Sequence, residues 1–479
     1  MPDKKTVYWF SLYFDIYRDI MKLPTVKQSF YLIIFAKSLK IFREGLSFPM
    51  INVKALADAH YDELVKLRRY FHEHPELSNV EDATCDTIQK KLEEYGIRTE
   101  VVEHGGVFGF IDNGPGKTVL MRADIDGLPI QETETNLNQK RVCVSKNPGV
   151  MHACGHDGHI SMLLTEAKIL QEIKDQWSGR VIFMFERAEE GSDATQHLMP
   201  YLLKQNIDYC YGTHVRWDVP AGKINVEKGA AMAGGFAFQI KIKGHGGHGS
   251  RPDLSQSPID CFHAFYGNLQ ALRMRDVNPL ECLTLSIGTV QAGSAYNVIP
   301  NELFFGGSSR FFSYEHAGKK FYDDFLKLLK NECDNYDCTY ELVRMKQPLL
   351  EVRNNPVCGD YARKAVAKYL GEDALYDVEP WMASETFGLT LSLFPGVFTF
   401  TGIANKEKGG VFNISKGMQQ EFGDASLIST KKASAPVSLP VSVMLLKCSL
   451  PNRKSNLNRI RKIRYSSACA VCNPPAARY

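Results

Sequence analysis

Between Met50 and about residue 230, short apolar runs rich in β-branched residues alternate with amphipathic segments. The segment YDELVKLRRYFHEHPELS (61–78) places apolar residues at helical spacing and ends at a proline-bearing turn. A second helix is predicted over 81–97, with Gly96 in the position of a C-cap. Strands are predicted for VFGFI (107–111), TVLMRADID (118–126) and RVIFMFERAEEG (180–191). This alternation is typical of an α/β layered domain, which we place over residues 50–230.

The pattern changes between residues 231 and 345. Alternating strands, a helix over about 257–275 and a second helix over 318–336 predict a two-layer α+β unit. The α/β style then resumes in PVCGDYARKAVAKYLG (356–371) and LFPGVFTFTGIAN (393–405). We therefore expect residues 231–345 to be a domain inserted into an α/β catalytic domain whose second part covers 346–425.

The two ends of the chain differ in charge from its middle. Residues 426–479 hold ten basic and no acidic residues, and residues 1–49 hold eight basic and four acidic ones. The part from 50 to 425 holds 39 basic and 50 acidic residues. We expect residues 1–49 to be an atypical extension and residues 426–479 to be an atypical, disordered basic tail.

The cysteines and the hydropathy indicate the compartment. Twelve cysteines lie scattered without a regular spacing, which favours reduced thiols and a cytoplasmic protein. No apolar stretch approaches the length of a membrane span, although an amphipathic surface anchor within the first 45 residues stays open. We expect neither a membrane nor a nucleic-acid partner, even though the basic tail could contact either.

The segment MHACGHDGHISMLL (151–164) concentrates metal-binding side chains in front of a helix predicted to begin near Ile160. Cys154 and His156 lie too close in sequence to share one helical face, so we expect both to project from a turn. A thiolate and an imidazole together suit a borderline divalent cation such as Zn²⁺ or Mn²⁺.

Two further elements contain candidate ligands. Glu189 and Glu190 are adjacent at a strand end, where a cation or different roles would relieve their repulsion. His214, in YGTHV, follows an apolar run and could equally be a packed or capping residue. Taken alone, the acidic pair could also be a solvated turn.

Seven motifs occur in a fixed order: MRADIDGLPI, GVMHACGHDGH, RAEEG, GTHV, GHGGHGSRPD, NVIP and ETFG. On these motifs the chain, from about Leu64 to about Asn413, resembles the M20 family of metallopeptidases and amidohydrolases. The most similar branch contains aminoacylases, hippurate hydrolases and hydrolases of indole-3-acetic acid (IAA) conjugates. The resemblance implies a zinc-peptidase-like catalytic domain with two divalent metal ions (Mn²⁺ or Zn²⁺) and an inserted dimerisation domain. It also implies a homodimer.

The resemblance assigns roles to residues of this chain. Glu189 matches the general base, and Asp126 matches an aspartate that orients a neighbouring ligand, with Asp124 a weaker candidate there. His152 and His159 would be supporting or packing residues. The implied metal ligands are Cys154, His156, Glu190 and His214. The implied substrate-binding residues are His248, which would polarise the scissile carbonyl in the partner subunit's site, and Asn297 and Arg310, which would lie near the substrate carboxylate.

The chain departs from the family pattern at its C-terminal end. The motif expected as Ser-Glu-Asp-Phe here has Thr386 in place of the acid. A histidine ligand is expected soon after Asn413, but no histidine follows His316. Water or Glu385 could replace that ligand. The abrupt change of composition motivates the hypothesis that the reading frame was lost near Asn413, which sequencing of the genomic locus would test.

The resemblance implies hydrolysis of N-acyl amino acids to a carboxylic acid and a free amino acid. Two alternatives within the family are an N-acetyldiaminopimelate deacetylase and a small dipeptidase. A third is a catalytically impaired homologue that only binds ligand and dimerises, which the absent histidine favours.

Overall fold

The computed structural model describes residues 52–136, 139–405, 411–413 and 419–421. The expected extension (1–49) and the expected basic tail (426–479) lie outside these residues. Within the described ranges, no helix combines the length and the apolar character that crossing a membrane requires.

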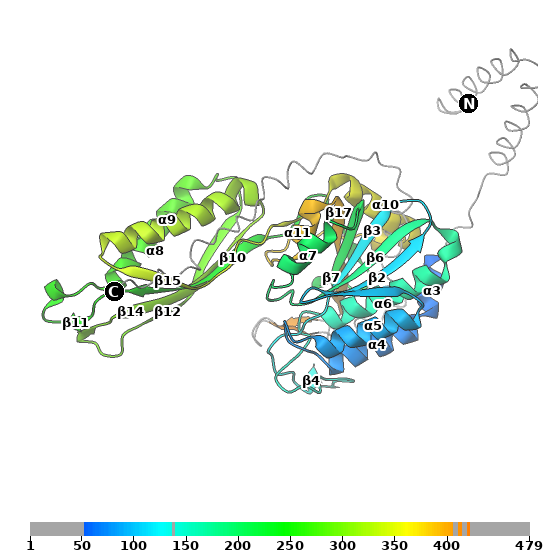
Figure 1. Cartoon of the computed structure of the whole chain (residues 1–479), viewed down its shortest axis with the longest axis horizontal. Helices are drawn as coiled ribbons and strands as arrows, with labels where there is room; N and C mark the ends of the chain where they lie inside the picture. Colours follow the sequence, from blue (N-terminus) through cyan, green and yellow to red (C-terminus); the bar gives the residue numbers. More distant parts are fainter. Residues whose placement is uncertain (1–51, 137–138, 406–410, 414–418, 422–479) are drawn as a thin grey trace, which may run out of the picture. The chain divides into compact units, whose positions relative to one another are not determined.

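A seven-stranded sheet organises the first and last parts of the described chain, in the strand order β1-β2-β6-β3-β7-β17-β8 (Figure 1). Its strands are β1 (Arg98–Val102), β2 (Gly106–Asn113), β3 (Thr118–Asp124), β6 (Gly179–Glu186), β7 (Tyr209–Pro220), β8 (Ile224–Asn225) and β17 (Gly396–Ala404). The helices of these parts are α3 (Val53–Ala59), α4 (Tyr61–Glu73), α5 (Asp82–Glu94), α6 (His156–Glu172), α7 (Thr195–Leu202), α10 (Pro356–Leu370) and α11 (Phe387–Leu393). Short hairpins are formed by β4 (Thr135–Asn136) with β5 (Gln139–Lys140) and by β18 (Val411–Asn413) with β19 (Gln419–Glu421).

The centre of this sheet is parallel. Strand β3 pairs in parallel with β6 and with β7, and β7 pairs in parallel with β17. The outer pairs β1–β2, β2–β6 and β17–β8 are antiparallel. Strands β3, β6 and β17 are buried along nearly their whole length. This explains why their sequences are continuous apolar runs and do not alternate.

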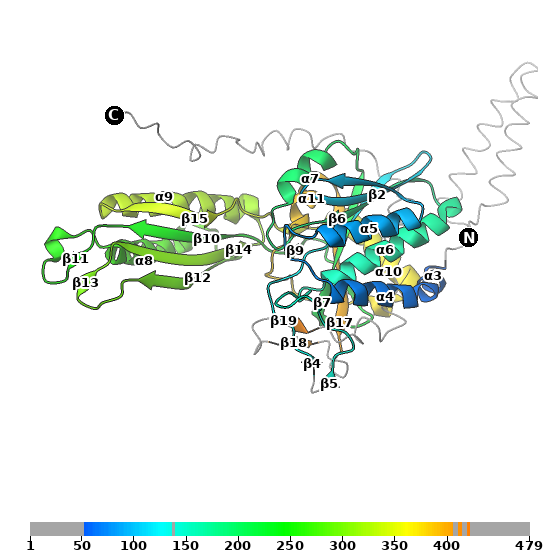
Figure 2. The same ribbon diagram turned by 60° about the horizontal axis from the view of Figure 1, so that its bottom comes forward.

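Helices cover both faces of the sheet (Figure 2). On one face, Val215 of β7 packs against Met162 of α6. On the other face, Phe398 of β17 packs with Leu198 of α7 and Phe387 of α11. Because successive side chains of a strand point to opposite faces, β7 contributes alternately to the two layers.

A second sheet forms from the segment between β9 (Ala230–Met232) and β16 (Val352–Arg353), and these two short strands pair with each other. The second sheet is antiparallel throughout, in the order β12-β14-β10-β15. It comprises β10 (Gly234–Lys243), β12 (Leu283–Ala292), β14 (Glu302–Phe311) and β15 (Thr339–Met345). Helices α8 (Pro258–Asp276) and α9 (Lys319–Asn335) cover it (Figures 1 and 2). The predicted α/β fold with an inserted α+β unit is confirmed.

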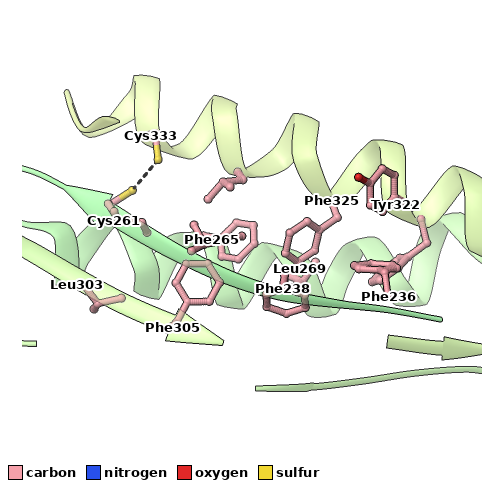
Figure 3. Packing of buried hydrophobic residues seen from close by; sticks show 14 of the residues in the cluster. Phe236, Phe238, Cys261, Phe265, Leu269, Leu303, Phe305, Tyr322, Phe325 and Cys333 are labelled. Carbon is pink, nitrogen blue, oxygen red and sulfur yellow. Dashed lines mark hydrogen bonds between the residues drawn. The ribbon is translucent and has the colours of Figure 1, made fainter. Parts of the chain in front are cut away.

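Aromatic side chains fill the layer between the second sheet and its helices (Figure 3). Phe238 of β10 lies 4.8 Å from Phe325 of α9, measured between ring centroids, and Phe265 of α8 lies 5.5 Å from Phe305 of β14. All four side chains are essentially buried. The alternation of apolar residues in FAFQIKI produces this face, since every second residue points toward the helices.

Glu166, on helix α6, is a buried acid without an ionic partner among the described residues. Glu166 is 1% exposed, and its Oε1 has no hydrogen-bond partner within the described chain. Burial alone raises the pKa of Glu166 well above its usual range. The folded protein therefore holds a proton there that the unfolded chain releases.

We expect this proton to make the unfolding free energy pH-dependent. Below the ordinary pKa of a glutamate, Glu166 is protonated in both the folded and the unfolded protein, so it does not lower the free energy of unfolding. As the pH rises above it, only the unfolded state ionises, so stability falls by up to about 1.4 kcal/mol per pH unit until the folded-state pKa is reached. Glu166→Gln should therefore gain stability over the unmodified protein between about pH 5 and pH 8, as read by denaturant unfolding of metal-free protein. Parallel pH curves for the two proteins would contradict this expectation.

Candidate metal centre

The carboxyl ends of three parallel strands meet at one edge of the seven-stranded sheet. Asp124, at the end of β3, lies in register with Glu186 at the end of β6, and β3 pairs with β7 up to two residues before His214. Open α/β sheets place their ligand sites at this edge. The segments following β3 and β6 carry the predicted residues Asp126, Glu189 and Glu190.

The structure corrects the predicted start of helix α6. The helix begins at His156 instead of near Ile160, so His156 lies in its first turn and Cys154 lies just before it. Gly155 between them has a φ of 96°, a left-handed conformation that favours glycine. This reversal turns the chain so that Cys154 and His156 can face one site although they are two residues apart.

Three groups of side chains converge on His156, with potential ligand atoms within 4.8 Å of one another in each group. The groups are Cys154 with His156 and His214, His156 with Glu189 and Glu190, and Asp124 with His156 and His159. The first two groups contain the four predicted ligands and the predicted general base. The third contains Asp124 and His159, for which the family resemblance implied only supporting roles.

His156 has one ring nitrogen within hydrogen-bond distance of Asp126, whereas the other makes no hydrogen bond among the described residues and lies 3.6 Å from Asp124 Oδ2. Its Nδ1 lies 2.9 Å from the backbone oxygen of Asp126 and 3.1 Å from Oδ1 of that residue. The other carboxylate oxygen of Asp126 accepts hydrogen bonds from the Ser78 hydroxyl and the Glu190 backbone amide, at 2.6 Å and 3.0 Å. The Nε2 atom of His156 is buried and has no hydrogen-bond partner within the described residues. Asp126 thus fixes the ring so that Nε2 faces the cluster.

His214 is arranged in the same way. Its Nδ1 lies 2.6 Å from the backbone oxygen of Val215, and its Nε2 lies 3.3 Å from the sulfur of Cys154. Burial lowers the pKa of His214 well below its usual range, and the neighbouring His159 adds to the effect. A neutral imidazole with an unprotonated Nε2 is the form that binds a metal ion.

Glu189 is buried beside this cluster. The backbone amide of Thr386 donates to its Oε1 at 3.2 Å. Ala188, directly before it, has a φ of 49°, and its amide is held by Glu81 Oε1 at 2.6 Å. Burial, followed by repulsion from Glu385 and Glu190, raises the pKa of Glu189 well above its usual range.

A buried arginine that the sequence analysis did not single out connects these parts. Arg122 of β3 donates to Asp124 Oδ2 at 2.8 Å and to Glu186 Oε2 at 2.7 Å. Its Nη2 lies 2.8 Å from Glu385 Oε1 and donates to the Thr386 hydroxyl at 2.9 Å. The side chain of Arg122 is 0% exposed. Its position could have indicated this role in the sequence, because a charged residue inside the apolar run TVLMRAD must be paired when the strand is buried.

This network also bears on Glu385, which the sequence left open as a substitute ligand. Glu385 Oε1 forms an ion pair with Arg122 and also accepts a hydrogen bond from the backbone amide of Phe387 at 3.1 Å. Within the described part of the chain, Glu385 belongs to none of the three ligand groups.

His152 was expected to support or pack. It is 1% exposed, and neither ring nitrogen has a hydrogen-bond partner among the described residues. Burial lowers the pKa of His152 to about 4, so its ring is neutral near pH 7. These properties are those of a packed histidine.

The three predicted substrate-binding residues lie in the inserted unit. His248 and Asn297 are neighbours, because the short strands β11 (Gly247–His248) and β13 (Val298–Ile299) pair and the Gly249 amide donates to the Asn297 oxygen at 2.9 Å. Both residues are exposed. Arg310 lies near the opposite end of β14, donates to the Ser309 oxygen at 3.1 Å, and has its pKa lowered by burial. None of the three belongs to the ligand groups found in the described residues.

The donor set fits divalent cations. One thiol, two imidazole nitrogens and two carboxylates converge, and His156 Nε2 is buried without a hydrogen bond among the described residues, with Asp124 Oδ2 3.6 Å away. Mixed sulfur, nitrogen and oxygen donors suit Zn²⁺ and related borderline ions.

Comparison with known proteins agrees with this geometry. The model of peptidase family M20/M25/M40 matches residues 120–414. The chain belongs to peptidase family M20. It is 33% identical over 356 residues to thermostable carboxypeptidase 2 of Saccharolobus solfataricus, covering 73% of this chain and 88% of that protein. It is 31% identical to IAA-amino acid hydrolase ILR1-like 2 of Arabidopsis thaliana, covering 73% of this chain and 79% of that protein.

Two further comparisons bear on the activity. The M20 chain is 37% identical over 269 residues to the N-acyl-L-amino acid amidohydrolase of Geobacillus stearothermophilus, covering 54% of this chain and 70% of that protein. Among solved structures, the Bacillus subtilis YXEP protein, a dinuclear metal-binding peptidase from the M20 family, superposes with a TM-score of 0.64 at 28% identity. The superposition covers 81% of this chain and 99% of that one. The chain is therefore a hydrolase, a metal-dependent amidohydrolase or peptidase of this family.

Proposed function

We propose that this M20 hydrolase cleaves the amide bond of N-acyl amino acids with two bound divalent ions, Mn²⁺ or Zn²⁺. The observation that carries the proposal is the convergence of two ligand groups on His156, whose buried Nε2 makes no hydrogen bond among the described residues. The relationship to an N-acyl-L-amino acid amidohydrolase and to an IAA-amino acid hydrolase supports this substrate class. Cys154, His156, Glu190 and His214 hold the ions.

The residues of the chain divide the chemistry between them. Metal ions, when bound, supply Lewis acidity to the scissile carbonyl and to the attacking water. Glu189 takes a proton from that water and passes it to the leaving amine, as a buried carboxylate held by the Thr386 amide can do. Asp126 keeps His156 in the orientation that leaves Nε2 free.

The inserted unit supplies the remaining groups. His248 polarises the scissile carbonyl, and Asn297 and Arg310 bind the substrate carboxylate, for which a guanidinium offers paired donors. We propose that His248 acts in the site of a second copy of the chain. Strand β12 supports this homodimer: it is an edge strand of the second sheet, and Val290 on it is 49% exposed. If analytical ultracentrifugation found only monomer, the homodimer proposal would be refuted. We also propose a cytoplasmic location, which the free cysteines of the described chain support.

The test is metal analysis beside hydrolysis by the full chain loaded with Mn²⁺ or Zn²⁺. We expect about two ions per chain and release of free amino acid from acetyl, benzoyl or indole-3-acetyl amino acids. A chelator should abolish turnover and added metal should restore it.

Other outcomes identify the alternatives. Cleavage of dipeptides with no cleavage of acyl amino acids would indicate a dipeptidase, and cleavage confined to N-acetyldiaminopimelate would indicate that deacetylase. Fewer than two ions with no turnover would indicate the impaired homologue, consistent with the absence of histidine after His316.

A further inference from the structure

His159 lies one helical turn after His156 and uses both of its ring nitrogens. The backbone amide of Val215 donates to His159 Nε2 at 2.9 Å. Since an amide N–H can only donate, Nε2 is unprotonated and the ring proton sits on Nδ1. That proton is donated to Asp124 Oδ1 at 2.6 Å. The partners of His159 therefore fix its tautomer.

These bonds exclude the third ligand group as an additional cation site. His159 has no free lone pair to offer, because Val215 occupies Nε2 and the proton occupies Nδ1. Asp124 is also engaged, since its Oδ2 accepts from Arg122 at 2.8 Å. The group of Asp124, His156 and His159 is a supporting network beside the metal ligands.

Val215, whose backbone amide donates to His159, also orients His214 through its backbone carbonyl. The Val215 carbonyl accepts from His214 Nδ1 at 2.6 Å, and this bond leaves His214 Nε2 pointing toward Cys154. In addition, the rings of His159 and His214 meet edge to face, with centroids 4.6 Å apart. A shift of the Val215 backbone would therefore change both the tautomer and the direction of the His214 ring.

We propose that His159 is a positioning residue for His214 and acts through the Val215 backbone, with Asp124 as its anchor. The proposal rests on the proposed function only in taking His214 as a metal ligand. Outer partners of metal-bound histidines set the tautomer and orientation of the ring, and their loss costs roughly 10–100-fold in metal affinity.

Two substitutions separate the two hydrogen bonds of His159. In His159→Gln the side-chain oxygen reaches the position of Nε2 and can still accept from Val215. In His159→Asn the amide nitrogen reaches the position of Nδ1 and can still donate to Asp124, but nothing accepts from Val215. Thr165→Val is the control for damage to α6, because Thr165 is buried on that helix and, among the described residues, its hydroxyl bonds only to the Ser161 oxygen.

The measurements are Zn²⁺ affinity by chelator competition and the ¹⁵N imidazole shifts of His214 in metal-free protein near pH 7. We expect His159→Asn to lose about 10–100-fold in Zn²⁺ affinity and to mix the His214 tautomers. His159→Gln and Thr165→Val should stay near the unmodified protein in both measurements.

Equal Zn²⁺ affinity and unchanged His214 shifts in His159→Asn would overturn the proposal. So would equal losses in the Asn and Gln variants, which would indicate a packing role. Absence of Zn²⁺ binding by the unmodified chain would refute the proposed function, whereas the metal-free shifts of His214 would still decide the role of His159.

Discussion

Replacing Glu189 by glutamine is expected to lower kcat for N-acyl amino acids by roughly 10²–10⁴-fold while bound metal stays unchanged. Glutamine keeps an oxygen that can accept from the Thr386 amide, which Glu189 does at 3.2 Å. It cannot take up and return a proton. Steady-state kinetics on the metal-loaded chain, with elemental analysis of the same samples, measures both quantities.

The neighbouring carboxylate provides the matched control. Glu190→Gln removes a proposed ligand instead of the base, so we expect it to lose metal as well as activity. If Glu189→Gln kept its activity, or lost metal as Glu190→Gln is expected to do, the division of roles between the two glutamates would be wrong.

Arg122→Met is expected to cost about 3–5 kcal/mol in the free energy of unfolding. The arginine has a fully buried side chain and faces Asp124, Glu186 and Glu385 at 2.7–2.8 Å. Its removal takes away the positive charge that these three buried carboxylates share. Denaturant unfolding of the metal-free chain measures the loss.

The control for Arg122→Met is an exposed ion pair. Lys146 pairs with Glu73 at 2.6 Å, but its side chain is 60% exposed, so Lys146→Met should leave the unfolding free energy essentially unchanged. Similar effects of the two substitutions would show that the carboxylates around Arg122 are neutral in the folded protein and need no countercharge.

Much of the fold could be predicted from local sequence patterns. The apolar runs 107–111, 118–126 and 180–191 correspond to β2, β3 and β6, because strands buried between two helical layers need continuous apolar sequence. The alternating FAFQIKI correctly indicated a sheet with one covered face. The start of α6 was predicted wrongly, because the polar sequence HDGH gives no helical periodicity and the left-handed φ of Gly155 is a property of the folded turn.

The candidate site, like the fold, could be predicted in part from the sequence. Residue type and order were enough to predict which side chains could bind metal, since thiols, imidazoles and adjacent carboxylates at strand ends are recognisable in a sequence. The hydrogen bonds and ion pairs that hold these side chains became visible in the folded chain alone. Arg122 meets Thr386 across 264 residues of chain, and His159 meets Val215 across 56. Such contacts depend on strand order and register, which bring distant segments to one sheet edge and which no local pattern encodes.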